Sequence, residues 1–239
     1  MFSKKTILIK KRKRSKNNSI SGSDSDSDSS TRTKLSFGFG HEADSNKVFH
    51  IDNHIYFTAD VAVKSINELC KIIKDHHDNF NSLTNISNIA NITPKPIYLH
   101  INSNGGDLLE GFRAVDMIRN STIPIYTIAE GSAVSAASIM YLAGQKKFMT
   151  VNSHLLIHQL SSCSGYQNFE QIKDNFKNDE NFMNRLYDFY CNASNGKLNK
   201  KKIIDAMKHD LYWNYDVCKK YNLVDDYYDN TTENKYKIY

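Results

Sequence analysis

The apolar positions of this chain switch between the spacing of strands and the spacing of helices along most of its length. Short runs rich in β-branched and aromatic side chains, bounded by polar residues or glycine, are typical of strands. Five such runs predict strands: HIYFT (54–58), PIYLHINS (96–103), PIYTIAE (124–130), KKFMT (146–150) and HLLIHQL (154–160).

Apolar residues three or four positions apart fill most of the intervals between these runs, and this spacing predicts helices. The predicted helices cover residues 61–77, 108–121, 131–144, 168–193 and 201–209. An Asn-rich stretch, residues 79–93, is expected to form a loop outside the core. Since strands alternate with helices, the pattern favours an α/β fold with parallel βαβ units.

The predicted helix at residues 131–144, GSAVSAASIMYLAG, is small and apolar yet contains three serines. Such serines bond to carbonyls of their own helix, or one of them is presented as a nucleophile at the helix N-terminus. With a helix beginning after Gly131, Ser135 lies nearest the N-terminus. Ser138 lies one turn further in and is expected to bond back to a carbonyl, while Ser132 lies in the entering turn.

Backbone amides at two places could bind an anion. Gly105 and Gly106 follow a predicted strand and precede a helix, so the chain can adopt positive φ there and expose its N–H groups. The first amides of the helix after Gly131 lack intrahelical partners, and the helix dipole favours negative charge beside them. A single Gly-Gly pair after a strand is weak evidence, because most such pairs are only turns.

Two histidines, His154 and His158, follow the serines and are the nearest candidates for a general base. Their spacing of four would suit a metal on a helix, but on a strand the two residues lie roughly 13 Å apart, too far for one zinc ion. We therefore expect no metal, and nothing in the sequence calls for a cofactor. His158 comes at the carboxyl end of its strand, where α/β sheets tend to carry their sites.

The basic character of the chain belongs to its first residues. Of the formal net charge of +5, residues 1–34 carry +7, so the rest is slightly acidic and a nucleic-acid-binding body is disfavoured. We expect a disordered tail over 1–45, basic and then rich in Ser and Asp, followed by a folded domain over 46–228 and a polar tail over 229–239. The basic cluster at 10–16 is read either as a nuclear-import or polyanion-binding patch or as a solubilising extension.

Two further features concern the cellular compartment. The four cysteines are widely spaced without a C-x-x-C pair, which is typical of reduced thiols in the cytosol or nucleus. Neither a signal-peptide core nor an apolar run long enough to span a membrane is found. We expect a cytoplasmic protein, with nuclear entry through the basic cluster as the alternative.

Several segments, taken in order, resemble the proteolytic subunit of Clp protease (ClpP), a family of the crotonase-like superfamily. The matching segments are INSNGG (101–106), GSAVSAASIMYLAG (131–144), NSHLLIHQL (152–160), GYQ (165–167), HDLYW (209–213) and YNLVDD (221–226). The resemblance implies a crotonase-like α/β fold of repeated ββα units with a protruding handle helix.

The resemblance also implies a catalytic site. Carried over residue by residue, it makes Ser135 the nucleophile, His158 the general base and Asp210 the carboxylate that orients the histidine. The backbone amides of Gly106 and Ala136 would form the oxyanion hole. The implied reaction is hydrolysis of peptide bonds by a serine endopeptidase.

The same resemblance implies an assembly of heptameric rings, homomeric or heteromeric and stacked face to face. Their chamber would admit unfolded polypeptides delivered by an AAA+ ATPase. Two alternatives are a catalytically silent ring subunit that scaffolds active paralogues and a crotonase-fold enzyme acting on acyl-CoA thioesters. An α/β-hydrolase is disfavoured because no G-x-S-x-G motif surrounds Ser135.

The chain departs from the family pattern beside the implied site. Asn104 stands where the family has a proline before the glycine pair, and Ala136-Ala137 stands for Met-Gly after the nucleophile. Leu160 replaces a proline that usually follows His-Gln. A backbone N–H survives each change beside the oxyanion hole, so these departures do not exclude activity.

Overall fold

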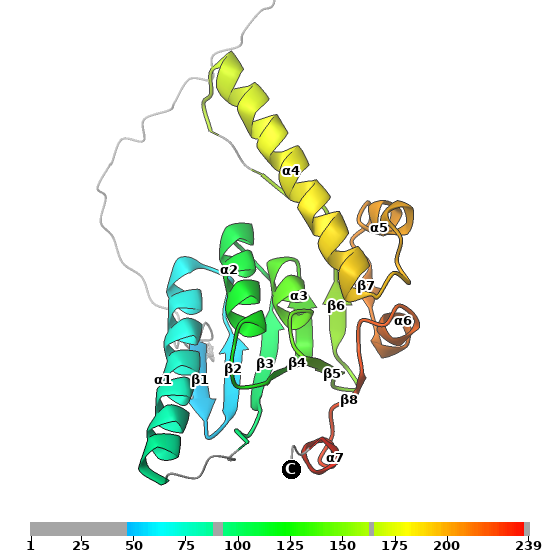
Figure 1. Ribbon diagram of the computed structural model, residues 1–239. Helices are drawn as coiled ribbons and strands as arrows, with labels where there is room; N and C mark the ends of the chain where they lie inside the picture. Colours follow the sequence, from blue (N-terminus) through cyan, green and yellow to red (C-terminus); the bar gives the residue numbers. More distant parts are fainter. Residues whose placement is uncertain (1–46, 88–92, 163–164, 237–239) are drawn as a thin grey trace, which may run out of the picture. The chain divides into compact units, whose positions relative to one another are not determined.

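A mixed α/β fold is seen in the computed structural model, which describes residues 47–87, 93–162 and 165–236 (Figure 1). These residues fall within one unit of the chain, residues 42–239. The predicted tail over residues 1–45 lies outside the described residues. Within them, eight strands form one sheet.

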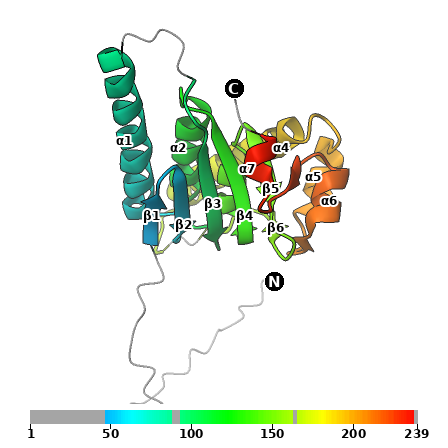
Figure 2. The same cartoon turned by 90° about the horizontal axis from the view of Figure 1, so that it is seen from below.

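The strands follow an order in which chain neighbours are mostly sheet neighbours. Their bounds are β1 (Lys47–Ile51), β2 (His54–Thr58), β3 (Ile97–Ser103), β4 (Ile125–Val134), β5 (Lys146–Met149), β6 (His154–Leu156), β7 (Tyr212–Trp213) and β8 (Asp226–Tyr227). The order is β1-β2-β3-β4-β5-β8, with β6 paired to the far end of β4 and β7 paired to β6 (Figure 2). The pairs β2/β3, β3/β4, β4/β5 and β4/β6 are parallel, which confirms the predicted βαβ units.

The helices are α1 (Val63–Ser87), α2 (Leu108–Arg119), α3 (Ala136–Tyr141), α4 (Phe169–Ala193), α5 (Lys200–Ala206), α6 (Tyr215–Lys220) and α7 (Thr232–Lys235). Two long helices begin with side-chain caps. The Asp107 carboxylate accepts from two amides at the start of α2, and Asn168 and Gln171 form a capping box at the start of α4.

Alternate residues of the central strands point to opposite faces of the sheet. One face carries Ile55, Leu99 and Ile101, which are fully buried in the main core with α1, α2 and α3. The opposite face carries a second, smaller cluster in which Tyr98 and Phe148 are buried and residues of the C-terminal part of the chain pack on them.

The first helix is longer than its sequence pattern predicted. The predicted end at residue 77 is wrong, because α1 continues to Ser87 and takes in the first part of the predicted Asn-rich loop. Phe80 extends the apolar side of α1 and packs against the main core. The helix therefore persists, and Asn79 and Asn81 are exposed, where they do not stop it.

The predicted helix over residues 131–144 begins too early. Strand β4 runs through to Val134, and only Ala136–Tyr141 are helical. The chain bends at Gly131, whose φ is +84°, and the strand then leaves β5 and pairs with β6. A Cβ on Gly131 would lie 2.9 Å from the Asn102 side-chain oxygen, so a tertiary contact, and not a helix, accounts for the glycine at this position.

Candidate active site

Ser135 lies at the sharp turn between β4 and α3 and has a strained backbone. Its φ of 54° is positive, which a non-glycine residue adopts only at some cost in energy. Its amide donates a hydrogen bond to the carbonyl of Leu156 in β6 at 2.9 Å. A serine on a strained strand-to-helix turn presents its hydroxyl outward, the arrangement of nucleophilic serines at strand ends.

The glycine pair after β3 packs directly against this turn. A Cβ on Gly105 would lie 2.6 Å from the Val134 carbonyl oxygen and 2.7 Å from the Ser135 Cβ. Gly105 also has a φ of +93°, in the region that favours glycine. The two segments that the sequence analysis singled out separately are thus in contact, and only glycine allows the approach.

The amides of Gly106 and Ala136 are available to a ligand. The Gly105 carbonyl accepts from the Val61 amide at 2.7 Å, and the Asp107 amide donates to the Val61 carbonyl at 2.7 Å, while Gly106 donates no hydrogen bond within the described residues. Ala136 is the first residue of α3, so its amide has no intrahelical partner. Both residues line the same cavity as Ser135.

That cavity has a volume of about 440 Å³, and His158 and Asp210 line it together with Ser135. His158 follows the end of β6, so the predicted strand over residues 154–160 is too long by several residues. The His158 Nδ1 lies 4.0 Å from the Asp210 Oδ1, and the exposed fractions of the two side chains are 26% and 80%. Among the hydrogen bonds of the described residues, none joins the Ser135 hydroxyl to His158.

A buried hydrogen-bond chain supports the turn from the side of α4. The Ser138 hydroxyl donates to the Ser135 carbonyl at 2.6 Å, which confirms the predicted bond back to a carbonyl. The Tyr190 hydroxyl lies 2.7 Å from the same Ser138 oxygen and is buried in the core. Burial raises the pKa of Tyr190, so its hydroxyl keeps its proton and can donate to Ser138.

Tyr190 was not found from the sequence. Its position in an amphipathic helix indicates only that it faces the core, and its contact with Ser138 depends on how α4 crosses α3. Ser132, expected in the entering turn of a helix, lies in β4 instead, where its amide donates to the Asn102 side chain at 3.2 Å.

The remaining walls of the cavity are mostly apolar. The side chains come from the start of α2, the ends of β4 and β6, the chain after β6, and α4; they are Leu108, Val134, Leu156, Leu160 and Leu186. An apolar cleft with a few convergent polar groups suits an extended peptide or a similar chain with apolar side chains.

His154 is separated from the other candidates. It pairs with Ser132 across β4 and β6 and lies edge-on to the ring of Tyr212, with 6.2 Å between the ring centres. No group of three or more His, Cys, Asp or Glu side chains is placed to hold a metal ion in the described part of the chain. Nor is any helix of that part long and apolar enough to cross a membrane.

Comparisons with known proteins give the family of the chain. The family model described as Clp protease matches residues 69–231. The chain is 30% identical over 142 residues to the ATP-dependent Clp protease proteolytic subunit of Deinococcus radiodurans, covering 58% of this chain and 68% of that protein. It is 53% identical over 74 residues to the ATP-dependent Clp protease proteolytic subunit 2 of Treponema denticola, covering 30% of this chain and 37% of that protein.

Proposed function

The chain belongs to the Clp protease family, and on this premise we propose that it is a serine endopeptidase that hydrolyses peptide bonds of unfolded polypeptides. We assign Ser135 as the nucleophile, His158 as the general base and Asp210 as the group that orients His158. The observation that carries the proposal is the strained Ser135 turn, which shares one cavity with His158 and Asp210.

The geometry suggests how the proton moves. The Nδ1 of His158 faces Asp210, which leaves its Nε2 to accept the proton of the Ser135 hydroxyl as the oxygen attacks a peptide carbonyl. The amides of Gly106 and Ala136 would stabilise the negative oxygen of the tetrahedral intermediate. His158 then donates the proton to the leaving amine, and water hydrolyses the acyl-enzyme with His158 again acting as base.

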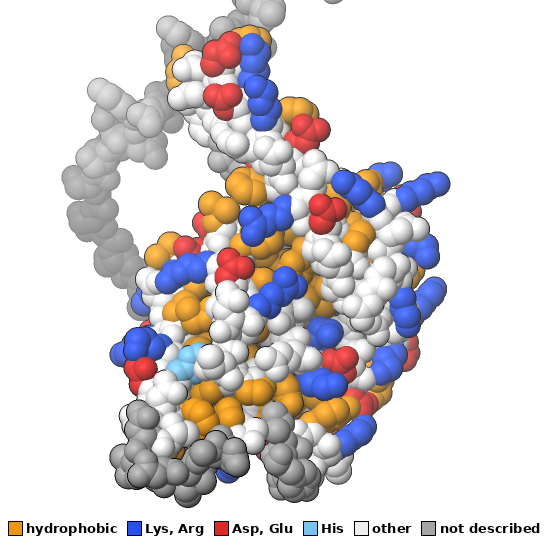
Figure 3. Space-filling model, in the orientation of Figure 1, with side chains coloured by type: hydrophobic (Ala, Val, Ile, Leu, Met, Phe, Trp, Pro, Cys, Tyr) orange, Lys and Arg blue, Asp and Glu red, His pale blue; other side chains and the backbone are white. Residues whose placement is uncertain are grey.

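We also propose that the protein works as part of a ring. The first half of α4 exposes an apolar stripe of Phe169, Ile172 and Phe176, which are 69%, 54% and 69% exposed. Their spacing places them on one side of the helix. On the face drawn in Figure 3, apolar side chains lie at the edges of this helix, beside charged ones. Such a stripe is costly in water and suits packing against a second subunit. Heptameric rings, homomeric or heteromeric, and an AAA+ ATPase that delivers substrate complete the proposal.

A second candidate is a catalytically silent ring subunit that scaffolds active paralogues. It is favoured by the 4.0 Å separation of His158 and Asp210 and by the 80% exposure of the Asp210 side chain. Against it stands the presence of all three triad residues around one cavity. Catalytic hydrogen bonds are often long before substrate binds, so the separation does not decide between the two candidates.

We place the protein in the cytoplasm, with nuclear import through the basic cluster at residues 10–16 as the alternative. Those residues lie outside the described part of the chain, and the proposal rests on their composition alone. Tagging the full-length chain and a variant lacking residues 10–16 with a fluorescent protein tests it. Nuclear signal that depends on the cluster would support the alternative.

Cleavage of an unfolded protein tests the proposed activity. We expect casein to be hydrolysed by the wild type and not by Ser135→Ala, with the ATPase-independent cleavage of short peptides lost in parallel. Ser82→Ala, an exposed serine of α1, is the matched control and should retain the wild-type rate. Equal cleavage by the wild type and Ser135→Ala would contradict the assignment, and cleavage by neither in an assembled ring would favour the silent subunit.

A further inference from the structure

Two histidines and two glutamates form a continuous chain of polar contacts on the sheet face opposite the main core. The Glu130 Oε2 lies 3.1 Å from the His100 Nδ1, and the His100 Nε2 lies 3.0 Å from the His54 Nδ1. The His54 Nε2 lies 3.4 Å from the Glu233 Oε1. This series of contacts therefore links β4, β3, β2 and α7. None of its four residues belongs to the candidate active site.

Aromatic rings surround the two imidazoles. The His100 side chain is 5% exposed, and Tyr56 stacks on it with 4.5 Å between ring centres. Tyr98 stacks on His54 at 5.0 Å, and Tyr228 meets His100 edge-on at 5.4 Å. Since little water reaches the middle of the chain, its nitrogen and oxygen atoms must satisfy one another.

In the described part of the chain, the tyrosines that contact the imidazoles, together with Tyr126, which contacts Tyr98, come from three strands and the segment after β8. Burial raises the pKa of each of them: Tyr56, Tyr98, Tyr126 and Tyr228. They therefore remain neutral at the pH values where histidines titrate. The Tyr228 hydroxyl donates to the Glu233 Oε1 at 3.0 Å, so that carboxylate is an acceptor on both sides.

The number of available hydrogens shows what this series of four side chains lacks. Three contacts in series, Glu130 to His100, His100 to His54, and His54 to Glu233, need one hydrogen each. Two neutral imidazoles bring only two hydrogens, and ionised carboxylates bring none. With both histidines neutral, one of the three contacts has no hydrogen between its two atoms. One additional proton completes all three contacts.

We propose that His54 and His100, held between Glu130 and Glu233, form a binding site for one additional proton, and that this proton ties the C-terminal segment to the sheet. By C-terminal segment we mean residues 228–236, which include α7. With the additional proton bound, each of the three contacts contains one hydrogen. Without that proton, one of the three contacts lacks its hydrogen.

His100 is the neutral member of the pair. Burial lowers the pKa of His100, the more enclosed of the two imidazoles, so it donates from Nδ1 to Glu130. Its Nε2 then accepts from the Nδ1 of His54, whose Nε2 faces the Glu233 Oε1 at 3.4 Å. The His54 side chain is 19% exposed, which makes it the better place for a charge.

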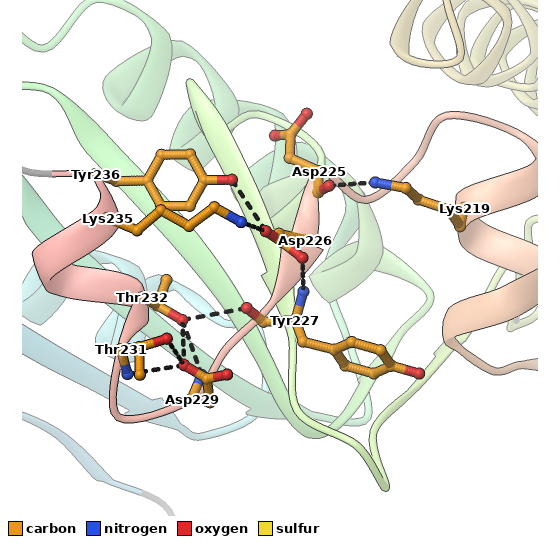
Figure 4. A network of polar contacts seen from close by, with 9 residues as sticks. All are labelled: Lys219, Asp225, Asp226, Tyr227, Asp229, Thr231, Thr232, Lys235 and Tyr236. Atoms are coloured by element: carbon orange, nitrogen blue, oxygen red, sulfur yellow. Dashed lines mark hydrogen bonds and ion pairs between the residues drawn. The ribbon is translucent and has the colours of Figure 1, made fainter.

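The C-terminal segment has other anchors that are insensitive to pH in this range (Figure 4). Lys235 pairs with Asp226, and the Tyr236 hydroxyl donates to the same carboxylate at 3.2 Å. Hydrogen bonds from Lys235 to Asp226 and from Thr231 to Asp229 lower the pKa of both carboxyls, so they stay ionised well below neutral pH. Among these anchors of the segment, the His54–Glu233 contact is the one that contains an imidazole.

The sign of the effect follows from linkage. Docking the segment brings Glu233 to His54, so the docked state binds the additional proton more tightly than the undocked state. Docking is therefore strengthened as the pH falls through the range of histidine titration and weakened as it rises.

Amide hydrogen exchange of the intact chain measures the docking. The amides of Thr232, Lys235 and Tyr236 donate within the segment, and a helix of four residues is not stable alone, so their protection reports docking. We expect protection factors roughly fivefold higher at pH 5.5 than at pH 7.5, the effect of one partly exposed ion pair. Protection factors remove the intrinsic pH dependence of exchange, and EDTA in the buffer removes any bound metal.

Glu130→Gln tests the shared series of contacts most sharply, because among the hydrogen bonds and ion pairs of the described residues Glu130 is linked to α7 only through the two imidazoles. The glutamine amide supplies the missing hydrogen, so all three contacts form with both histidines neutral. We expect protection at both pH values to equal that of the wild type at pH 5.5. Glu233→Gln supplies the hydrogen from the other end and should behave alike, whereas Glu170→Gln, in an exposed pair on α4, should retain the wild-type response.

Three results would overturn the proposal. Equal amide protection of the wild type at both pH values would mean that docking of the C-terminal segment is not linked to a proton. A wild-type pH response in Glu130→Gln would mean that His54 and Glu233 form a local ion pair without the rest of the chain. Low protection at both pH values in folded Glu130→Gln and Glu233→Gln would mean that the carboxylate charge, and not the number of hydrogens, holds the segment.

Discussion

At the scale of single residues, the backbone of Ser135 is fixed from three directions. Gly105 lies against it, the Leu156 carbonyl accepts from its amide, and Ser138 donates to its carbonyl. A residue with a positive φ persists only where its surroundings hold it. The contacts around Ser135 therefore affect the reactivity of its hydroxyl as well as the stability of the fold.

Gly105→Ala should break this turn. The added methyl group would lie within 2.7 Å of Val134 and Ser135 atoms, and alanine is strained at the φ of +93°. We expect a loss of roughly 3 kcal/mol in the free energy of unfolding, measured by urea denaturation, and loss of peptidase activity. Gly165→Ala, with no atom within 4 Å of the added methyl, is the matched control. Wild-type stability in Gly105→Ala would contradict the close approach.

Tyr190→Phe should lower the reactivity of Ser135 with little change in packing. The substitution removes the hydroxyl that meets Ser138 at 2.7 Å but keeps the ring. We expect a loss of about 1 kcal/mol in stability and a several-fold fall in kcat with KM unchanged. Tyr187→Phe, on the same helix, should leave kcat unchanged. A Tyr190→Phe enzyme with the wild-type kcat would show that the hydrogen bond between Tyr190 and Ser138 contributes to stability and not to catalysis.

At the scale of elements, the sequence predicted α4 best, because its apolar residues are regularly spaced. The bounds of α4 were predicted to within one residue. The prediction failed at β4, where Gly131 has a positive φ and lies against the Asn102 side chain, a contact that no local pattern shows. It also missed β7 and β8, because two residues carry no periodicity.

The apolar stripe on α4 belongs to this scale. We expect Phe176→Asp to reduce the size of the assembly measured by sedimentation velocity, because it places a charge in the surface proposed to join subunits. Far-UV circular dichroism should stay unchanged, since Phe176 is 69% exposed in the single chain. Asn178→Asp, a neighbouring exposed residue, controls for the added charge. An assembly of unchanged size would remove the stripe from the subunit contact.

At the scale of the whole molecule, the candidate site could be predicted only because its motifs occur in order along the chain. Ser135, His158 and Asp210 come from three distant segments, and no local pattern links them. The structure brings them to one cavity through the β4/β6 and β6/β7 pairings. The series of contacts around His54 and His100 could not be predicted in this way, because only the sheet register and the docking of α7 bring its residues together.

Assembly and catalysis should be linked at this scale. Asp210 is 80% exposed in the single chain, so contact with a neighbouring subunit could complete its approach to His158. We expect peptidase activity per subunit to fall when the protein is diluted below the concentration at which rings form. Phe176→Asp should show the low activity at every concentration. Constant activity per subunit across the dissociation would contradict this link.

The most direct test of the account is the labelling of Ser135 by a fluorophosphonate probe, read by intact mass and by peptide mapping of the assembled protein. We expect one adduct, on Ser135, and at least a hundredfold slower labelling in His158→Ala, because the hydroxyl loses its base. Ser135→Ala should take up no probe, and Ser82→Ala should react as the wild type. An assembled wild type without an adduct, or one labelled equally fast without His158, would contradict the claim that Ser135 is an activated nucleophile.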